Sequence, residues 1–173
     1  MVPVISFVGN SGVGKTTFLE KLIGVLKARG YRVAAIKHDA HKFEIDYPGK
    51  DSWRLTQAGS DVTIISSRDK LALIERSETE RSLGDLVQMV SGRVDIVLTE
   101  GYRGAAAMKI EVSRKAHSHI LTARLDDLIA IVTDERFEYP VPQFDLEDAP
   151  GVADFLGRRF ALRQPRLATE ECG

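Results

Sequence analysis

The chain has 173 residues, close to the size of one ordinary domain, and the 43% that are hydrophobic suffice for a sizeable core. Because 24 basic residues face 25 acidic ones, the net charge of −1 gives no electrostatic basis for general binding to nucleic acids or anionic membranes. The sequence has no apolar run of the roughly 18 residues that span a bilayer, no signal peptide, and a single cysteine, Cys172, which excludes an internal disulfide and a cysteine zinc site. These properties predict a cytoplasmic protein.

The first predicted strand and the first predicted helix flank a glycine-rich loop. An apolar run predicts a strand at Val4–Val8, and the spacing of apolar residues predicts a helix at Lys15–Ala28 that ends at Gly30. Between them, residues 9–16 match G-x-x-x-x-G-K-[ST], the P-loop or Walker A motif. Its glycines let backbone N–H groups turn toward phosphate oxygens, and the start of the helix adds partial positive charge. We therefore expect a nucleoside triphosphate as the ligand.

The P-loop residues have separate expected roles. Lys15 can reach the β- and γ-phosphates, the Thr16 hydroxyl can bind Mg²⁺, and Thr17 can meet the α-phosphate. The predicted nucleotide-binding residues of the loop are Gly9, Asn10, Ser11, Gly12, Val13, Gly14, Lys15, Thr16 and Thr17.

A second strand is predicted at residues 32–37, and the polar stretch that follows, residues 38–50, reads as a loop. It leaves the strand at the carboxyl end, on the P-loop side. In nucleotide switches such a loop places a carboxylate near the γ-phosphate, where it orients water or reaches Mg²⁺ through water. Asp39 and Asp46 are the candidates for this catalytic role, and an exposed polar loop is the alternative.

Two histidine pairs raise the question of a metal site. His38 and His41 have H-x-x-H spacing, and His117 and His119 form a second pair. Neither pair is accompanied by cysteines or by a cluster of carboxylates, so the sequence gives little support for metal binding by histidine.

A short helix and a hairpin are predicted next. Asp51 or Ser52 can cap a helix that stops at Gly59. Two strand-like runs, residues 62–65 and 71–74, have the spacing of an antiparallel hairpin, which we expect to be attached to the main sheet. Its exposed strand edges are a candidate pairing surface for a dimer.

The remaining elements alternate between helix and strand, which predicts an α/β protein: a three-layer P-loop NTPase fold with a mainly parallel sheet and the added antiparallel hairpin. We expect one nucleotide-binding domain over residues 1–162 and a frayed tail over residues 163–173. The remaining predicted elements are a helix at residues 82–90, strands at residues 95–99, 108–112 and 128–132, and a helix at residues 152–160.

A P-loop needs an acidic residue at the tip of a neighbouring strand to hold Mg²⁺. Glu100 follows a buried run at its carboxyl end, where ligands of open α/β sheets bind, and Gly101 lets the backbone turn close to the phosphate. Asp95 is the competing carboxylate, but it opens the strand and should lie roughly 17 Å away at the other edge. The expected metal ligands are therefore Thr16 and Glu100.

Guanine is commonly read by a carboxylate in the motif Asn-Lys-x-Asp. The chain has one asparagine, Asn10, so that motif is absent. Asp134 follows the buried strand at residues 128–132 at its carboxyl end, which makes it the candidate base-reading residue. The alternative is that it caps the turn at residues 135–136.

These motifs together resemble one known family, MobB, the molybdopterin-guanine dinucleotide biosynthesis proteins B, over residues 4–160. The diagnostic part is the Pro-Gly-Lys-Asp-Ser segment, followed by Glu-Gly-aromatic and Lys-Ile-Glu-Val. The segments that carry the resemblance are residues 9–17, 37–38, 46–52, Arg54, residues 58–59, 100–102, 109–112 and 132–134.

The resemblance implies a homodimeric GTP-binding protein with weak GTPase activity. It would assist the guanylyltransferase MobA, which joins GMP to molybdopterin, and the pterin itself is a further candidate ligand near residues 46–52. No strong catalytic base and no obvious arginine finger stand out, so slow hydrolysis is expected, because such fingers contribute about 10³- to 10⁵-fold in rate.

Three other functions stay open. A small-molecule kinase would need a lid with arginines, and Arg76, Arg81, Arg103 and Arg114 are the candidates, although they are scattered through ordinary surface contexts. A metallochaperone GTPase usually carries a histidine-rich tract or Cys-x-x-Cys, and the chain has neither. The third alternative function is a non-catalytic scaffold in which the P-loop has only a structural role.

Overall fold

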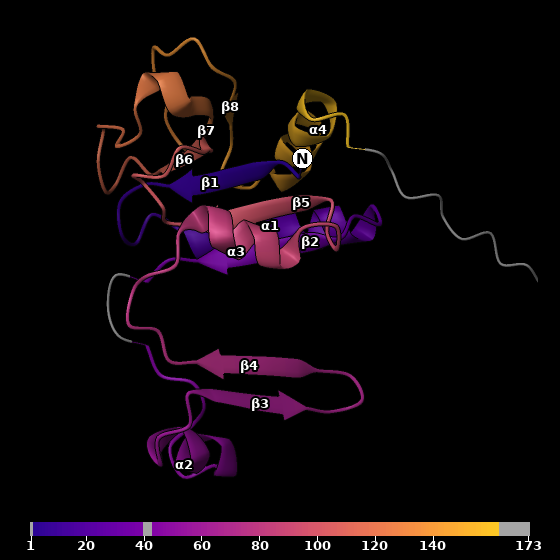
Figure 1. Ribbon diagram of the computed structural model, residues 1–173. Coiled ribbons are helices and arrows are strands. Elements are labelled where there is room, and N and C mark those ends of the chain that lie inside the picture. The colour runs from indigo at the N-terminus through magenta and orange to yellow at the C-terminus, as the bar shows by residue number, and fades with distance from the viewer. Residues whose placement is uncertain (1, 40–42, 163–173) are drawn as a thin grey trace, which may run out of the picture. The chain divides into compact units, whose positions relative to one another are not determined.

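The computed structural model describes residues 2–39 and 43–162 and divides into two compact units (Figure 1). The first unit comprises Met1–His38 and Leu83–Gly173, and the second is Asp39–Ser82. The predicted domain over residues 1–162 spans the whole second unit and the first unit up to residue 162. The predicted tail at residues 163–173 lies outside the described residues.

The first unit is built on a parallel sheet in the order β2-β5-β1-β6-β7-β8. Strands β1, β5 and β7 are mostly apolar because helices and loops bury both faces of a parallel sheet. Their carboxyl ends lie at one edge of the sheet, which is the edge where the P-loop begins. The strands are β1 (Val4–Val8), β2 (Val33–Lys37), β5 (Ile96–Glu100), β6 (Met108–Ser113), β7 (Leu128–Thr133) and β8 (Gln143–Phe144).

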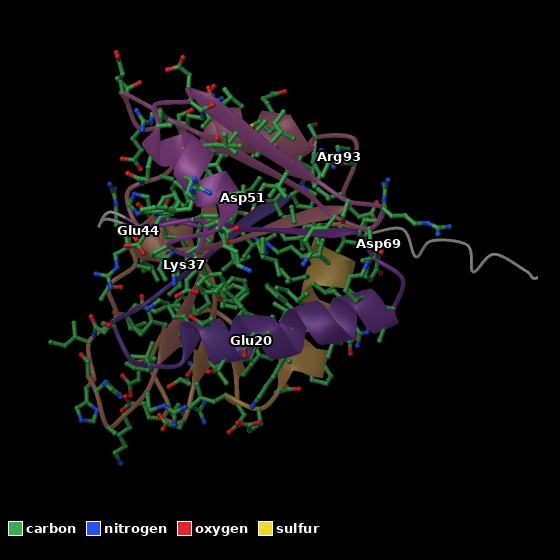
Figure 2. The ribbon with its side chains drawn as sticks, turned by 90° about the horizontal axis from the view of Figure 1, so that it is seen from below. Glu20, Lys37, Glu44, Asp51, Asp69 and Arg93 are labelled. Atoms are coloured by element: carbon green, nitrogen blue, oxygen red, sulfur yellow. The ribbon has the colours of Figure 1, made fainter. Side chains whose placement is uncertain are left out.

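Helices α1 (Lys15–Ala28) and α4 (Ala149–Arg159) pack against each other and contribute to the same hydrophobic core as the sheet. In α1 the buried residues Phe18, Leu22 and Leu26 recur every four positions, while Glu20 lies on its exposed side (Figure 2). The first unit also contains α3 (Leu83–Val90).

Helix α4 begins before its predicted start at residue 152. The Asp148 carboxylate accepts a hydrogen bond from the Gly151 N–H at 2.9 Å, and Pro150 occupies the first turn, where its missing N–H costs nothing. Pro150 and Gly151 favour a turn in sequence, so the prediction placed the start too late. The one-turn helix η1 (Leu125–Asp127) and the short strand β8 were not predicted.

The second unit contains α2 (Asp51–Gln57) and a hairpin of β3 (Val62–Ser66) and β4 (Leu71–Glu75). The hairpin prediction is confirmed, but its attachment to the main sheet was wrong, because β3 and β4 form a separate two-stranded sheet.

The predicted cap of α2 was also wrong. Lys50 occupies the cap position and makes no side-chain cap hydrogen bond. Asp51 stands one residue inside, in the first turn, where its charge still favours the helix start. The Ser52 hydroxyl instead donates to the Asp46 carboxylate at 2.8 Å.

The α/β class with a mainly parallel sheet and an antiparallel hairpin is thus confirmed. In residues 2–39 and 43–162, no helix combines the length and the apolar character needed to cross a membrane.

Two charged side chains of β6 are almost fully buried. Lys109 is 2% exposed and donates to the Ala105 carbonyl at 3.0 Å and to the Asp127 carboxylate at 2.8 Å. The hydrogen bond from Lys109 is the main cause that lowers the pKa of Asp127. Lys109 therefore ties the loop before β6 to the turn before β7.

The second buried charge, Glu111, is 1% exposed. Its carboxylate accepts from the Thr122 N–H at 2.6 Å, the Thr122 hydroxyl at 3.0 Å and the Ala123 N–H at 2.6 Å. These bonds hold the loop after β6 and compensate the desolvation of the carboxylate.

We predict that Glu111→Ala lowers the free energy of unfolding of the first unit by roughly 3 kcal/mol, because three partly buried donors lose their acceptor. Urea denaturation followed by circular dichroism measures the loss. Glu147→Ala is the matched control, since Glu147 is 76% exposed and its ion pair with Lys21 should contribute at most about 1 kcal/mol. Equal losses in the two variants would contradict a structural role for Glu111.

Candidate nucleotide-binding site

The P-loop connects β1 to α1 in a conformation that depends on glycine. Gly9 has φ +138° and Gly14, the N-cap of α1, has φ +95°. A Cβ on Gly9 would lie 2.2 Å from the Val112 carbonyl oxygen of β6, so no other residue fits there without moving backbone. The close approach to β6 fixes where the loop leaves the sheet.

Lys15 lies back over the loop from the first turn of α1. Its ammonium group donates to the Asn10 carbonyl at 2.8 Å and to the Gly9 carbonyl at 3.2 Å. Burial lowers the pKa of Lys15, Glu100 opposes this, and Arg103 and Lys37 lower it further. The Lys15 ammonium therefore lies above the main chain that is predicted to surround the phosphates.

The structure brings Thr16 and Glu100 together. The Thr16 hydroxyl donates to the Glu100 carboxylate at 2.8 Å. The contact follows from the parallel pairing of β1 and β5, in which Phe7 lies opposite Glu100. Hydroxyl and carboxylate oxygens are hard ligands of the kind that Mg²⁺ prefers, and they can coordinate it together with phosphate oxygens.

The competing carboxylate, Asp95, lies at the other edge of the sheet. It forms an ion pair with Arg32 at 2.7 Å, before the first residues of β5 and β2. The hydrogen bond from the Arg32 side chain is the largest cause that lowers the pKa of Asp95. Asp95 therefore stabilises the amino end of the sheet, as its position at the start of the strand predicts.

The turn after β5 adds a cation that sequence reasoning missed. Gly101 and Tyr102 have φ +95° and +55°, and the Arg103 guanidinium donates to the Gly9 carbonyl. In the sequence, Arg103 is one of several arginines scattered along the chain, and nothing there distinguishes it from the others. Its proximity to the P-loop follows only from the position of β5 beside β1 and from two left-handed residues in succession.

Lys37 supplies a further positive charge at this edge of the sheet. It is the last residue of β2 and lies opposite Glu100 in the register of β2 and β5. It is one of the charges that lower the pKa of Lys15.

The loop after β6 borders the P-loop on the other side. A Cβ on Gly12 would lie 3.1 Å from the His117 ring, and one on Gly14 would lie 3.5 Å from the Arg114 guanidinium. His119 instead contacts the Glu135 carboxylate at 2.7 Å.

The two histidine pairs do not form a metal cluster in the described residues, where no group of three His, Cys, Asp or Glu side chains could hold an ion. His117 and His119 have different neighbours, and His41 lies outside the described residues. The ring of His38 packs against Tyr102 at 4.9 Å between centroids.

Asp134 follows β7, two strands from the P-loop in the order β1-β6-β7, which corresponds to roughly 10 Å. One of its oxygens accepts from the Lys115 N–H at 2.7 Å, a contact that sequence reasoning missed. Asp134 also lines an open cavity of about 1210 Å³, together with the aromatic side chains of Phe137 and Tyr139. The reading of the base by Asp134 stays a prediction.

Asp39 and Asp46 belong to the second unit. The Asp46 carboxylate accepts from the Tyr47 N–H at 2.6 Å and from the Ser52 hydroxyl, and these two bonds lower its pKa in that order. A carboxylate with a lowered pKa is a weaker proton acceptor. The catalytic assignments of Asp39 and Asp46 stay predictions.

Comparison with known proteins yields one family. Residues 4–134 match the model of MobB, described as molybdopterin guanine dinucleotide synthesis protein B. The chain is 37% identical over 162 residues to the molybdopterin-guanine dinucleotide biosynthesis adapter protein of Escherichia coli K12, covering 90% of this chain and 92% of that protein. It is 35% identical to the protein of the same name from Haemophilus influenzae, over 90% of this chain and 88% of that one.

The solved structures agree with the sequence matches. The crystal structure of Bacillus subtilis MobB superposes with a TM-score of 0.74 at 27% identity, over 94% of this chain and 99% of that one. The resemblance deduced from the motifs is therefore confirmed, and the chain belongs to the MobB family.

Proposed function

We propose that this protein is a GTP-binding adapter with slow GTPase activity that assists the attachment of GMP to molybdopterin. The observation that carries the proposal is the convergence of Lys15, Thr16 and Glu100 at the start of α1. Main-chain amides of the P-loop bind the phosphates, Lys15 neutralises β/γ charge, and the helix start adds its dipole.

Mg²⁺ is the proposed cation. Thr16 and Glu100 would hold it, and when bound it neutralises charge on the phosphate oxygens. The lowered pKa of Asp46 makes this carboxylate a weaker proton acceptor, which supports slow hydrolysis by the isolated protein. Slow hydrolysis is compatible with the proposed adapter role, because that role depends on keeping the nucleotide bound and not on fast turnover.

The proposed partner is the guanylyltransferase MobA. Relatives that share 35% and 37% of their residues with this chain over most of its length are named as adapter proteins of molybdopterin-guanine dinucleotide biosynthesis. Direct contact with molybdopterin, near residues 46–52, is the part of the proposal that depends on the family resemblance alone.

We predict that Lys15→Ala weakens binding of magnesium-bound GTP by about 100-fold, because a charged donor to two phosphates is lost. Isothermal titration with GTP and with ATP measures the affinity and the base preference. The same variant should lose its stimulation of GMP transfer by MobA in a reconstituted assay.

Lys27→Ala is the matched control for Lys15→Ala, since Lys27 is an exposed lysine in the last turn of the same helix. It should bind GTP as the unmodified protein does. Unchanged GTP affinity in Lys15→Ala would refute nucleotide binding at the P-loop. Normal GTP binding without any stimulation of MobA by the unmodified protein would refute only the adapter role.

We further propose that guanine is read in the cavity beside Asp134. Asp134→Asn should weaken GTP binding and improve binding of xanthosine triphosphate, because an amide complements the extra oxo group of xanthine. Competition titrations with the two nucleotides measure the exchange of preference. Asp126→Asn, a change at a carboxylate that is 87% exposed, is the control. If the variant lost affinity for both nucleotides to the same extent, the role of Asp134 would instead be the structural hydrogen bond with the Lys115 N–H.

The homodimer is proposed to form through the hairpin of the second unit. On one face of its two strands lie Val62, Ile64, Leu71 and Leu73, which are 45%, 59%, 68% and 50% exposed. An isolated two-stranded hairpin is marginally stable in water, and an apolar face of this kind is typical of an interaction surface.

We predict that Leu73→Lys converts the dimer into a monomer, because it places a charge in the proposed apolar contact. Size-exclusion chromatography with light scattering gives the mass. Arg68→Ala, at the tip of the same hairpin, should leave the dimer intact. A monomeric unmodified protein, or a Leu73→Lys dimer of unchanged stability, would contradict this interface.

A further inference from the structure

We propose that Arg103 binds the terminal phosphate of the nucleotide in cis and so makes the site distinguish a nucleoside triphosphate from a diphosphate. This inference rests on the proposed nucleotide site and assigns a role to a residue outside the P-loop motif. Its basis is the convergence of two cationic side chains on one carbonyl group.

The shared carbonyl belongs to Gly9. It accepts hydrogen bonds from the Lys15 ammonium at 3.2 Å and from the Arg103 guanidinium. Two cations that share one acceptor repel each other, and a single neutral carbonyl compensates this poorly. An anion between them would be attracted by both. The lowering of the Lys15 pKa, for which burial is the largest cause and Arg103 a further one, agrees with their proximity.

The positions of Lys15 and Arg103 indicate which phosphate Arg103 would contact. A P-loop lysine contacts the β- and γ-phosphates, and the first turn of the helix holds the phosphates closer to the ribose. Arg103 donates to the carbonyl of Gly9, the first residue of the loop, whereas α1 starts at the other end of the loop. It therefore approaches from the side of the terminal phosphate. The carboxylate of Glu100, the last residue of β5, contacts Thr16.

The turn that presents Arg103 is fixed. The Gly101 N–H donates to the Phe7 carbonyl of β1 at 3.2 Å, and the His38 N–H donates to the Glu100 carbonyl at 2.9 Å. Tyr102 keeps a left-handed φ of +55° with its ring packed against His38 at 4.9 Å. A non-glycine residue adopts this conformation at a cost, and such residues occur preferentially at ligand sites. The planar guanidinium suits a phosphate because it can donate two parallel hydrogen bonds.

A purely structural role is the alternative, in which Arg103 only caps the Gly9 carbonyl. The two roles differ in their effect on the two nucleotides. A structural cap supports the whole P-loop, so its loss would weaken GTP and GDP alike. A contact with the terminal phosphate would affect the triphosphate alone.

The test measures the affinities of the full-length protein for a non-hydrolysable GTP analogue and for GDP, both with Mg²⁺, by titration calorimetry. Arg103→Ala should lose about 10- to 100-fold in affinity for the analogue and less than about 3-fold for GDP. Arg103→Lys keeps the charge without the planar fork and should lose less for the analogue. Arg124→Ala, at an arginine that is 83% exposed, is the matched control and should change neither affinity.

An equal loss for the two nucleotides in Arg103→Ala and Arg103→Lys would overturn the inference, and so would an unchanged affinity for the analogue. If the unmodified protein bound neither nucleotide, the proposed function itself would fail. If it bound both while Arg103→Ala kept the full preference for the triphosphate, only the role of Arg103 would fail. Arg103→Lys, which retains a donor to Gly9, keeps the test valid if Arg103→Ala does not fold.

Discussion

The hydrogen bond between Thr16 and Glu100 joins the two halves of the candidate site. Thr16 lies in the first turn of α1, whereas Glu100 ends a strand more than eighty residues later in the chain. The two meet because β1 and β5 are parallel neighbours that end at the same edge of the sheet. The hydroxyl and the carboxylate provide the oxygen donors of the proposed Mg²⁺ site, so the pairing of these two strands determines where that site can form.

The neighbouring strand β6 supports the same edge from the other side. Its Val112 carbonyl leaves no room for a side chain at Gly9, which sets the path of the P-loop. The buried side chains Lys109 and Glu111 hold the loops before and after the strand. The two charged residues of the Lys-Ile-Glu-Val segment thus act through packing and hydrogen bonding within the fold.

Local patterns made most of the first unit predictable. The bounds of β1 and α1 agree with the prediction, since an apolar run, a glycine loop and a four-residue apolar spacing are each read within a few neighbours. Glu100 could be placed because its position relative to the strand decides at which edge it lies. The separate sheet of the hairpin, the contact of Arg103 with Gly9 and that of Asp134 with Lys115 could not. Each depends on which distant segments become neighbours, and no local periodicity encodes this.

The position of Lys15 has a consequence for ligand entry. Its ammonium group already lies over the loop, held by the Gly9 and Asn10 carbonyls, and much of its rotamer freedom is lost during folding. An incoming phosphate meets a preorganised site, and its charged oxygens replace the neutral carbonyls as hydrogen-bond acceptors for Lys15. Recognition then requires little reorganisation of the main chain, which would favour the proposed binding of a nucleotide at this site.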